Sequence, residues 1–419
     1  MVARRATVRD MRRSNRAVLL SKIYLDGPLS RHELTQLTSL SPASVSTLVA
    51  EFIEEGLVEE AGSVESDGGR PRVLLRVAPS FGHVIGVDVG ETRVTVELFD
   101  MSMAALAKAD YPIEPNQLEP KVTVAHILEG ITAVCAQAGV DQSTVLGVGV
   151  AFPGVVDSGE EGLVHAQHLG WADGVPIGTM LRAGTQIPVH IDNGAKTLGQ
   201  AEMWFGAGRG TQHAVIALVG SGVGAAVVAD GASYRGSRSS AGEWGHTTLV
   251  YGGRRCRCGA LGCLEAYVGA EGILDRYRDA NGRSAPGIDE ESAIGALIAA
   301  ADSSPTASEV LNQTVGYLGA GIATLINLFN PERIVLGGWA GTALGGRWLP
   351  EIRAAAAKHA LKLPFAQTTI TLCELGPDAV ALGAATLPVA RLLADGGLRP
   401  AAAAQAALVR GPRVRIPPR

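Results

Sequence analysis

The sequence predicts an α/β fold of two lobes that follows a small helical head. Short apolar segments ending in glycine turns alternate with helical segments from about residue 79 to residue 395, a pattern typical of an α/β body. Two short helices with good capping residues precede this region. A length of 419 residues allows two or three domains, each with its own core. We expect a head at 1–78, a body at 79–395 whose lobes divide near residue 192, and a disordered, alanine-rich and proline-rich tail at 396–419.

Charge is distributed unevenly along the chain. The net charge is −5, but residues 1–50 hold seven arginines and one lysine against three carboxylates, so they carry +5 and the remainder carries −10. A basic end on an acidic body is typical of a part that binds a polyanion, although a solvated basic tail would explain the charge equally well. No apolar run approaches the roughly 18–20 residues that cross a membrane, and none near the start suits a secretory signal. We expect a soluble cytoplasmic protein without a membrane partner.

The head contains three predicted helices. Apolar residues recur at helical spacing over residues 13–25, and a Gly-Pro pair ends the pattern. Ser30 caps a short second helix over 30–37. Ser41, followed by a proline in the first turn, opens a third helix over 41–55. Two short helices joined by a tight turn indicate a helix-turn-helix.

In a helix-turn-helix, the second helix of the pair enters the major groove of DNA with its N-terminal residues. Small polar side chains at these positions suit a close approach to the edges of the bases. The candidate DNA contacts on this helix are Ser41, Ala43, Ser44, Ser46 and Thr47.

Two strands follow the helices, beginning at 56–60 and at 73–77, and a polar turn at 63–69 separates them. Arg70 and Arg72 lie on this flexible wing tip and could reach a phosphate or the minor groove. The head is therefore predicted to be a winged helix-turn-helix that binds double-stranded operator DNA. A homodimer or homotetramer is expected, because such proteins usually read paired half-sites. The alternative is a winged helix that binds only protein.

The body begins with a buried strand from residue 83 that runs into a glycine turn and a return strand. Further strands also end in glycine turns, with helices between them. The expected segments are strands at 145–151, 215–219 and 333–336, and helices near 121–138 and 307–329. Each turn alone is weak evidence of function, since such turns are common wherever a strand bends toward a helix.

One short, glycine-rich segment gathers four residues of the types that bind metals. One imidazole and three thiolates would complete a tetrahedral zinc shell and leave no open position for substrate or water. The sequence therefore predicts one structural zinc per chain, which holds a loop and does no chemistry. The alternative is a pair of disulfides or a set of unconnected buried thiols, and four ligands at tight spacing disfavour both. The four candidate ligands are His246, Cys256, Cys258 and Cys263.

The order of the glycine turns is more specific than any one of them. Asp-x-Gly-x-Thr at 88–92, Gly-Ser-Gly-x-Gly at 220–224 and Leu-Gly-Gly at 336–338 resemble the two phosphate loops and the adenosine loop of the actin-like ATPase fold. Together with the cysteine segment, the chain resembles the ROK family over about residues 10–395. This family comprises sugar kinases and sugar-responsive transcriptional repressors, such as repressors of the N-acetylglucosamine and xylose type.

The resemblance implies a sugar site beside the metal. It would be built by Asn193, Glu243, His246 and Glu265. Carboxylates accept hydrogen bonds from sugar hydroxyls, and an amide can donate or accept them. His246 would bind zinc through one ring nitrogen and face the sugar with the other. The alternative is that Glu243 and Glu265 are surface charges or supports of the metal ligands.

Two positions depart from the pattern of the family's kinases. The carboxylate base that would deprotonate a sugar hydroxyl is replaced by Gly194, and Asp192 is two residues too early to take its place. Glu91 puts a carboxylate in the first phosphate loop, where the kinases have glycine. We therefore predict no catalytic residue and a regulator, a repressor of genes for carbohydrate uptake or metabolism, that binds a sugar without phosphorylating it. The alternative is an active ATP-dependent sugar kinase with an appended DNA-binding head.

Overall fold

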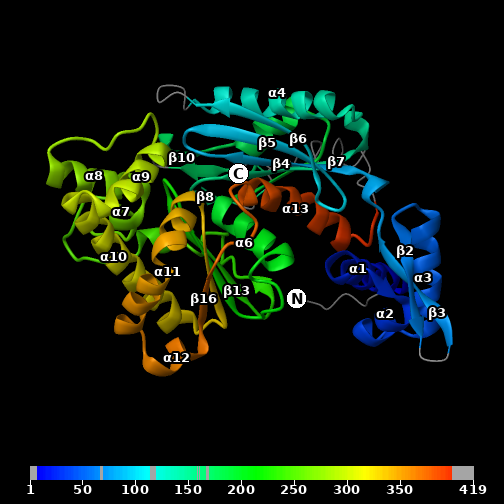
Figure 1. Cartoon of the computed structure of the whole chain (residues 1–419). Helices are drawn as coiled ribbons and strands as arrows, with labels where there is room; N and C mark the ends of the chain where they lie inside the picture. Colours follow the sequence, from blue (N-terminus) through cyan, green and yellow to red (C-terminus); the bar gives the residue numbers. More distant parts are fainter. Residues whose placement is uncertain are drawn as a thin grey trace, which may run out of the picture.

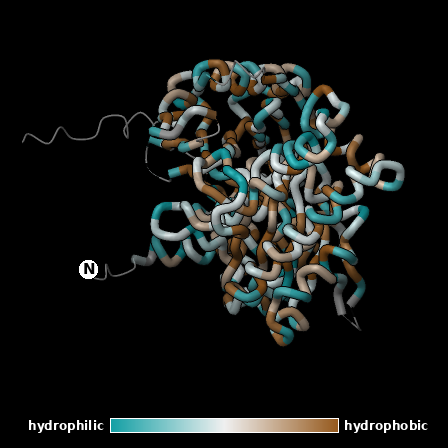
Figure 2. The backbone as a smooth tube through the Cα atoms, turned by 90° about the vertical axis from the view of Figure 1, so that its left-hand side faces the viewer, coloured by the Kyte–Doolittle hydropathy of each residue, from teal (hydrophilic) through white to brown (hydrophobic). Residues whose placement is uncertain are grey.

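The structure, a computed structural model, describes residues 7–66, 69–113, 119–157, 159, 161–166 and 169–398. It has a head at one end and two lobes, each built on a five-stranded sheet (Figure 1). Hydrophobic segments run mainly through the middle of the body and hydrophilic segments lie mostly around it (Figure 2). Among the described residues, no helix is long and apolar enough to cross a membrane.

The head has the helices that the sequence predicts, with one boundary moved. They are α1 (Val8–Asp26), α2 (Arg31–Thr38) and α3 (Pro42–Glu54). Helix α1 begins five residues earlier than expected, because Thr7 and Asp10 form a reciprocal capping box. The predicted caps Ser30 and Ser41 both accept hydrogen bonds from backbone N–H groups three residues ahead, at 3.3 and 3.1 Å.

The wing of the head is longer than expected. Strands β2 (Val58–Ser66) and β3 (Gly69–Val77) form an antiparallel pair, and β1 (Leu29–Ser30) adds to the other edge of β3. The predicted turn at 63–69 was wrong in extent, because residues 63 and 64 pair with 73 and 72 as ladder residues. Arg72 therefore lies in a strand and not on a turn. Three helices followed by this hairpin are the elements that the predicted winged helix-turn-helix requires.

The first lobe contains a mixed sheet in the order β11-β7-β4-β5-β6. The strands are β4 (His83–Val89), β5 (Arg93–Asp100), β6 (Ala105–Pro112), β7 (Val145–Phe152) and β11 (Val189–Asn193). Helix α4 (Pro120–Ala138) contacts β5 and β6. A small sheet of β8 (Val155–Val156), β9 (Val164–Ala166) and β10 (Trp171–Val175) and the short helix α5 (Ile177–Gly184) complete the lobe.

The last helix of the body, α13 (Ala379–Ala394), returns to the first lobe and packs on β4 and β7. Two strand glycines make this close packing possible. A Cβ atom at Gly86 or Gly149 would lie within 2 Å of a carbonyl oxygen of α13, so any side chain there would push the helix off the sheet.

The second lobe is built on a sheet in the order β14-β13-β12-β15-β16. Its strands are β12 (Ala214–Val219), β13 (Val223–Ala229), β14 (Ala232–Ser233), β15 (Arg333–Gly337) and β16 (Thr369–Leu372). Its helices are α7 (Glu265–Val268), α8 (Ala270–Asn281), α9 (Glu290–Ala299), α10 (Pro305–Phe329), α11 (Trp339–His359) and α12 (Lys362–Gln367). Helix α6 (Gly194–Phe205) follows β11 and packs against α13.

The head shares a hydrophobic core with the body. Buried residues of α1, α3 and β3 contact Val389, Leu392 and Leu393 at the end of α13 and Phe99 of the first lobe. Burying each such side chain stabilises the interface by about 1.5–3 kcal/mol. The chain remains packed beyond residue 395, since Gly397 lies against Leu57 of the head. The predicted disordered tail at 396–419 was therefore wrong for residues 396 and 397, and residues 399–419 lie outside the described part of the chain.

Candidate metal centre and ligand cleft

The four predicted metal ligands come together in the structure. The ligand atoms of His246, Cys256, Cys258 and Cys263 all lie within 4.8 Å of one another. The Sγ atoms of Cys258 and Cys263 are 3.7 Å apart, and Cys256 Sγ is 3.7 Å from His246 Nδ1. A tetrahedral zinc with bonds of about 2.3 Å to sulfur would hold two sulfurs roughly 3.8 Å apart. The donor set and its spacing therefore fit zinc.

The chemistry of the thiols also fits a metal. All three cysteines are free, and a sulfur separation of 3.7 Å is far longer than the roughly 2.05 Å of a disulfide. Burial raises the pKa of both Cys256 and Cys263, so neither thiol would ionise readily without a cation beside it. The three sulfurs form no disulfide in this arrangement, and together with the imidazole they are a donor set that suits a metal cation.

Backbone hydrogen bonds fold the segment back on itself around these ligands. Gly259 N donates to Cys256 O, and Cys256 N donates to Ala260 O, both at 2.9 Å. Gly262 has φ +82°, and a Cβ there would lie 1.7 Å from a backbone oxygen. Only glycine fits this position, which brings Cys263 back toward the first two cysteines.

Beside the cluster is a cleft of about 230 Å³ lined by residues of both lobes. All four residues predicted to bind a sugar line it: Asn193, Glu243, His246 and Glu265. His246 is exposed, and its Nδ1 atom is on the side of the sulfurs, which leaves Nε2 at the opposite side of the ring. The predicted double role of His246 is therefore compatible with the geometry.

Asn193 holds the chain as well as lining the cleft. Its Oδ1 caps helix α6 by accepting from the N–H groups of Ala195 and Lys196, at 2.9 and 3.2 Å. Its Nδ2 donates to Gly154 O at 2.7 Å. An amide can make about four hydrogen bonds, so only one donor of Asn193 remains for a ligand.

The two predicted glutamates are not surface charges. Glu265 is 7% exposed, and its Oε2 accepts from Val223 N at 2.9 Å, while Oε1 lies 3.5 Å from Cys256 Sγ. Burial raises the pKa of Glu243, although nearby His246 and Lys196 lower it. Glu265 thus holds the backbone at Val223 and contacts the ligand Cys256, whereas Glu243 lines the cleft.

Gly194 is the first residue of α6 and lines the cleft. A Cβ atom at this position would meet nothing closer than 3.8 Å, so the site has room for an aspartate. Asp192 is buried and engaged elsewhere, since its Oδ2 is 2.5 Å from Arg235 Nη2 and its Oδ1 accepts from Asn193 N at 2.9 Å. Among these residues, no free carboxylate stands at the position of a base.

Sequence reasoning missed Arg257, which lies between two of the ligand cysteines. Its Nη1 is 2.6 Å from Glu91 Oε2 of the first lobe, and its Nη2 donates to Ser221 O of the second lobe at 2.9 Å. Glu91 was predicted to put a carboxylate in the phosphate loop, and the structure adds that Arg257 pairs with this carboxylate. The only signal in the sequence was an arginine inside the cysteine motif.

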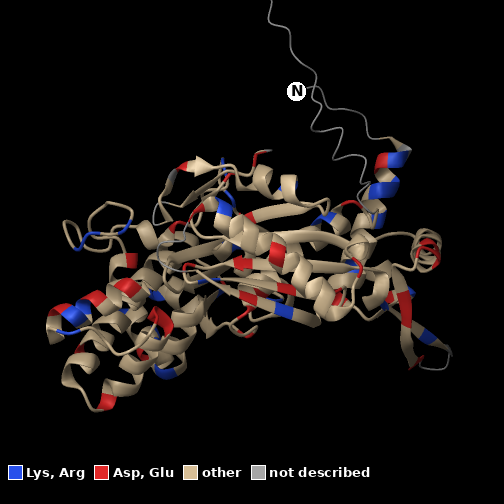
Figure 3. Cartoon of the chain, turned by 90° about the horizontal axis from the view of Figure 1, so that it is seen from above, with Lys and Arg blue, Asp and Glu red and all other residues tan. Residues whose placement is uncertain are grey.

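The predicted DNA contacts lie largely at the surface of the head. Ser41, Ala43, Ser46 and Thr47 are exposed, while Ser44 is half-buried and its Oγ is 2.9 Å from Ser41 Oγ. Arg72 is exposed on the wing, and the side chain of Arg70 lies outside the described residues. Lys and Arg residues form bands along the free end of α1 (Figure 3).

Two packed helices connect the cleft with the head. Helix α6 begins with Gly194 at the cleft and ends beside the head, where the rings of Trp204 and Tyr24 of α1 are 5.9 Å apart. Helix α13 has Val380 of its first turn in the lining of the cleft and ends at Ala394, and the next residue, Asp395, forms an ion pair with Arg13 of α1. The two helices lie side by side between the lobes and the head (Figure 1).

The chain therefore combines a head of three helices and a β hairpin with a two-lobed body whose cleft lies beside a cluster of metal-type ligands. Residues 84–391 match the ROK family. The chain belongs to this family, as the glycine turns and the cysteine segment indicated.

The relatives include both regulators and kinases. The chain is 28% identical to the xylose repressor of Caldicellulosiruptor bescii, over 91% of this chain and 97% of that protein. It is 29% identical to the DNA-binding transcriptional dual regulator NagC of Escherichia coli, over 77% of this chain and 80% of that one. A ROK family transcriptional regulator described as a homologue of the E. coli MLC protein has a similar structure, with TM-score 0.75, 28% identity and coverage of 92% of this chain and 98% of that chain.

A kinase structure matches less of the chain. A ROK family glucokinase from Streptomyces griseus, in complex with glucose and AMPPNP, superposes with TM-score 0.60 and 26% identity. The match covers 73% of this chain and 99% of the glucokinase chain.

Proposed function

We propose that this chain is a transcriptional repressor that binds operator DNA through its head and a sugar through its cleft. The observation that carries the proposal is the share of this chain that regulators and kinases match. The similarity to the xylose repressor and to the solved regulator extends over nine-tenths of this chain, whereas the whole glucokinase covers only 73% of it. The shared core between head and body supports the same reading, because it ties the part that would bind DNA to the part that would bind sugar.

The proposed repressor does not phosphorylate its sugar. Phosphoryl transfer depends on positioning and on neutralising charge at the phosphates. Gly194 supplies no base, and Glu91 places a carboxylate in the glycine turn between β4 and β5. Both differences disfavour phosphoryl transfer, so the cleft is proposed to bind a sugar without phosphorylating it.

The metal is proposed to be one structural zinc per chain. His246, Cys256, Cys258 and Cys263 would hold it, and with four protein ligands it would supply loop rigidity rather than an activated water. His246 and Glu265 would then connect the zinc loop directly with the sugar. Binding of operator DNA places the proposed site of action in the cytoplasm.

Helices α6 and α13 are the proposed route from sugar to DNA. Both start at the cleft, and with about 1.5 Å of rise per residue they reach roughly 18 and 24 Å toward the head. Gln200 of α6 donates to Thr386 of α13 at 2.8 Å, so the two helices are joined along their length. A ligand that closes the lobes would move their starts, and the shared core would carry that movement to the head. A two-fold assembly of such heads remains a prediction.

Arg72 is expected to contribute a DNA contact. The Arg72→Ala protein should bind operator DNA more weakly by about 1 kcal/mol or more, and its log–log salt slope should fall by about one, because one phosphate contact is lost. Gel retardation on the promoter beside the protein's own gene, repeated at rising salt, measures both. Arg283→Ala is the matched control, since Arg283 is an exposed arginine in the loop after α8, outside the head. Equal affinity of the two variants would refute the wing contact, and failure of the wild type to retard DNA at low salt would refute operator binding.

A further inference from the structure

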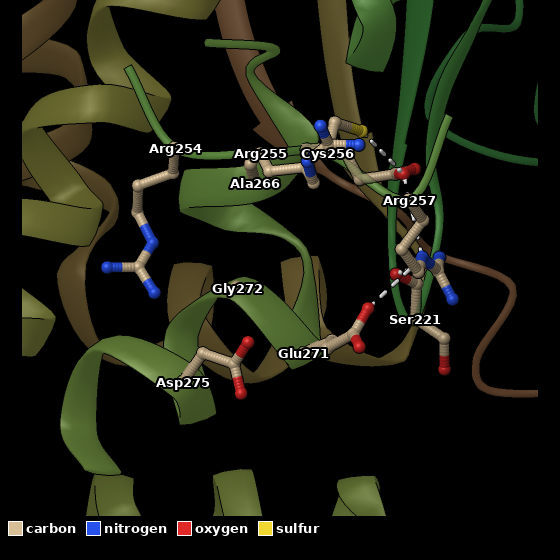
Figure 4. Close-up of a pocket in the computed structure, with 10 residues that line it drawn as sticks. Ser221, Arg254, Arg255, Cys256, Arg257, Ala266, Glu271, Gly272 and Asp275 are labelled. Carbon is tan, nitrogen blue, oxygen red and sulfur yellow. Dashed lines mark hydrogen bonds and ion pairs between the residues drawn. The ribbon is translucent and has the colours of Figure 1, made fainter. Parts of the chain in front are cut away.

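Arg257 joins the two lobes at the place where their glycine turns face each other. Besides Glu91 and the carbonyl of Ser221, its Nε lies 3.3 Å from Glu271 Oε2 and 3.7 Å from Glu265 Oε1. Figure 4 shows the side chain reaching toward Ser221, with the carboxylate of Glu271 directed at it from α8. The guanidinium is four-fifths buried, so these contacts are poorly screened by solvent.

The guanidinium occupies the space between the turns. Glu91 belongs to the turn between β4 and β5, and Ser221 belongs to the turn between β12 and β13. A Cβ atom at Gly222 would lie 3.9 Å from Arg257 Nη2, so the side chain lies directly over the second turn. An arginine held between two such turns is a ready partner for an oxyanion, and here that oxyanion is a carboxylate of the protein itself.

We propose that Glu91 and Arg257 form an internal substitute for the phosphates of a nucleotide. The carboxylate takes the position of the anion, and the guanidinium takes the position of the group that would neutralise it. The chain thereby ties its own lobes across the cleft and excludes nucleotides from it. Exclusion of nucleotides goes beyond the proposed function. A repressor requires only that no phosphate be transferred, and it could still bind ATP without reaction.

The charge of the rest of the cleft supports the exclusion. Glu91, Glu243 and Glu265 share the cleft with Asp88 and with three consecutive acidic residues at 289–291. The two arginines in the lining are both engaged, Arg257 as described and Arg93 with Glu291 at 3.5 Å. A polyphosphate entering this cleft would meet repulsion without a free cation in the lining to offset it.

The test measures binding of AMPPNP with magnesium by isothermal titration calorimetry. The wild type is expected to give no binding at millimolar nucleotide. The Glu91→Gly protein is expected to bind at least about tenfold more tightly, because Arg257 is released and a negative charge is removed. Arg257→Ala should not gain binding, since the carboxylate of Glu91 stays in the first turn while the guanidinium that faced it is removed. The double variant should bind more weakly than Glu91→Gly, and that non-additivity identifies the pair as a unit.

Glu291→Gln is the matched control. It removes one negative charge from the same cleft without releasing Arg257, so it should gain far less than Glu91→Gly. Glu91→Gln serves as the second variant if the glycine variant does not fold, and it is expected to gain binding for the same reason. Nucleotide binding by the wild type, or equal gains in Glu291→Gln and the Glu91 variants, would overturn the proposal. Operator retardation is measured on the same preparations, so loss of DNA binding would count against the proposed repressor and not against the tie.

Discussion

The Cys258→Ser protein is expected to lose its zinc and to unfold at a lower temperature than the wild type. Four-ligand zinc sites contribute about 10–16 kcal/mol in small zinc domains, so a share of about 3 kcal/mol for one ligand is modest. For a lobe of about 150–250 residues, that loss lowers the melting temperature by roughly 6–12 °C. Sugar affinity should fall as well, because His246 and Glu265 both contact Cys256, whose position depends on the metal.

Metal analysis and thermal unfolding of the same preparation measure this effect. Cys135→Ala is the matched control, because Cys135 is a buried cysteine in α4 of the first lobe and takes no part in the cluster. It should keep one zinc per chain. Full zinc content in Cys258→Ser, or an unchanged sugar response in metal-free protein, would contradict the proposed link between metal and cleft.

The Arg16→Met protein is expected to bind operator DNA but to respond weakly to sugar. Arg16 of α1 is 7% exposed, and its Nε donates to Gly396 O beyond α13 at 2.9 Å. Its two terminal nitrogens contact Glu51 of α3 at 3.1 Å and Glu55, the residue that follows α3, at 2.5 Å. The guanidinium also lies 4.6 Å from the ring centre of Phe52. Methionine keeps the apolar stem and removes every donor.

Because Glu51 and Glu55 are partly exposed, the stability cost of Arg16→Met should stay near about 1–3 kcal/mol. The effect of Arg16→Met on the response to sugar should be larger than its effect on stability. Coupling between two sites typically changes the affinity of one ligand by about 5- to 150-fold when the other ligand binds. The factor by which sugar changes operator affinity should approach one when Arg16 no longer links the end of α13 to α3.

The measurement for Arg16 is operator affinity with and without the sugar that most raises the melting temperature in a panel of sugars. Arg12→Met is the matched control, since Arg12 contacts Glu51 at 2.5 Å from the same helix and, in the part of the chain that the structure describes, forms no hydrogen bond with Gly396. A normal sugar response in Arg16→Met would show that the signal reaches the head by another path, for example through Tyr24 and Trp204.

Features that depend on neighbouring residues could be predicted from the sequence. The caps at Ser30 and Ser41, the glycine turns at strand ends and the four metal-type residues all rest on spacings of a few residues, and the structure has them where the sequence places them. The wing turn was misplaced because a polar stretch can be a turn or an exposed strand, and strand pairing decides which.

Features that depend on distant partners could not be predicted. Arg257 and Glu91 are 166 positions apart, and Arg16 and Gly396 are 380 apart. Nothing in the local pattern around either arginine distinguishes a side chain that ties two parts together from one in solvent. Glu91 shows the consequence: its charge was noted from the sequence, but the partner that neutralises it came only with the fold.

The central claim is that this chain senses a sugar without phosphorylating it. The most direct test is one titration of labelled operator DNA with purified protein, magnesium and ATP, in the presence and absence of the sugar found by thermal shift, with ADP measured in the same samples. The sugar is expected to weaken operator binding, and ADP is expected to stay at the level of the protein-free control. Sugar-dependent ADP formation at the rate of a kinase, or operator binding that ignores the sugar, would contradict it.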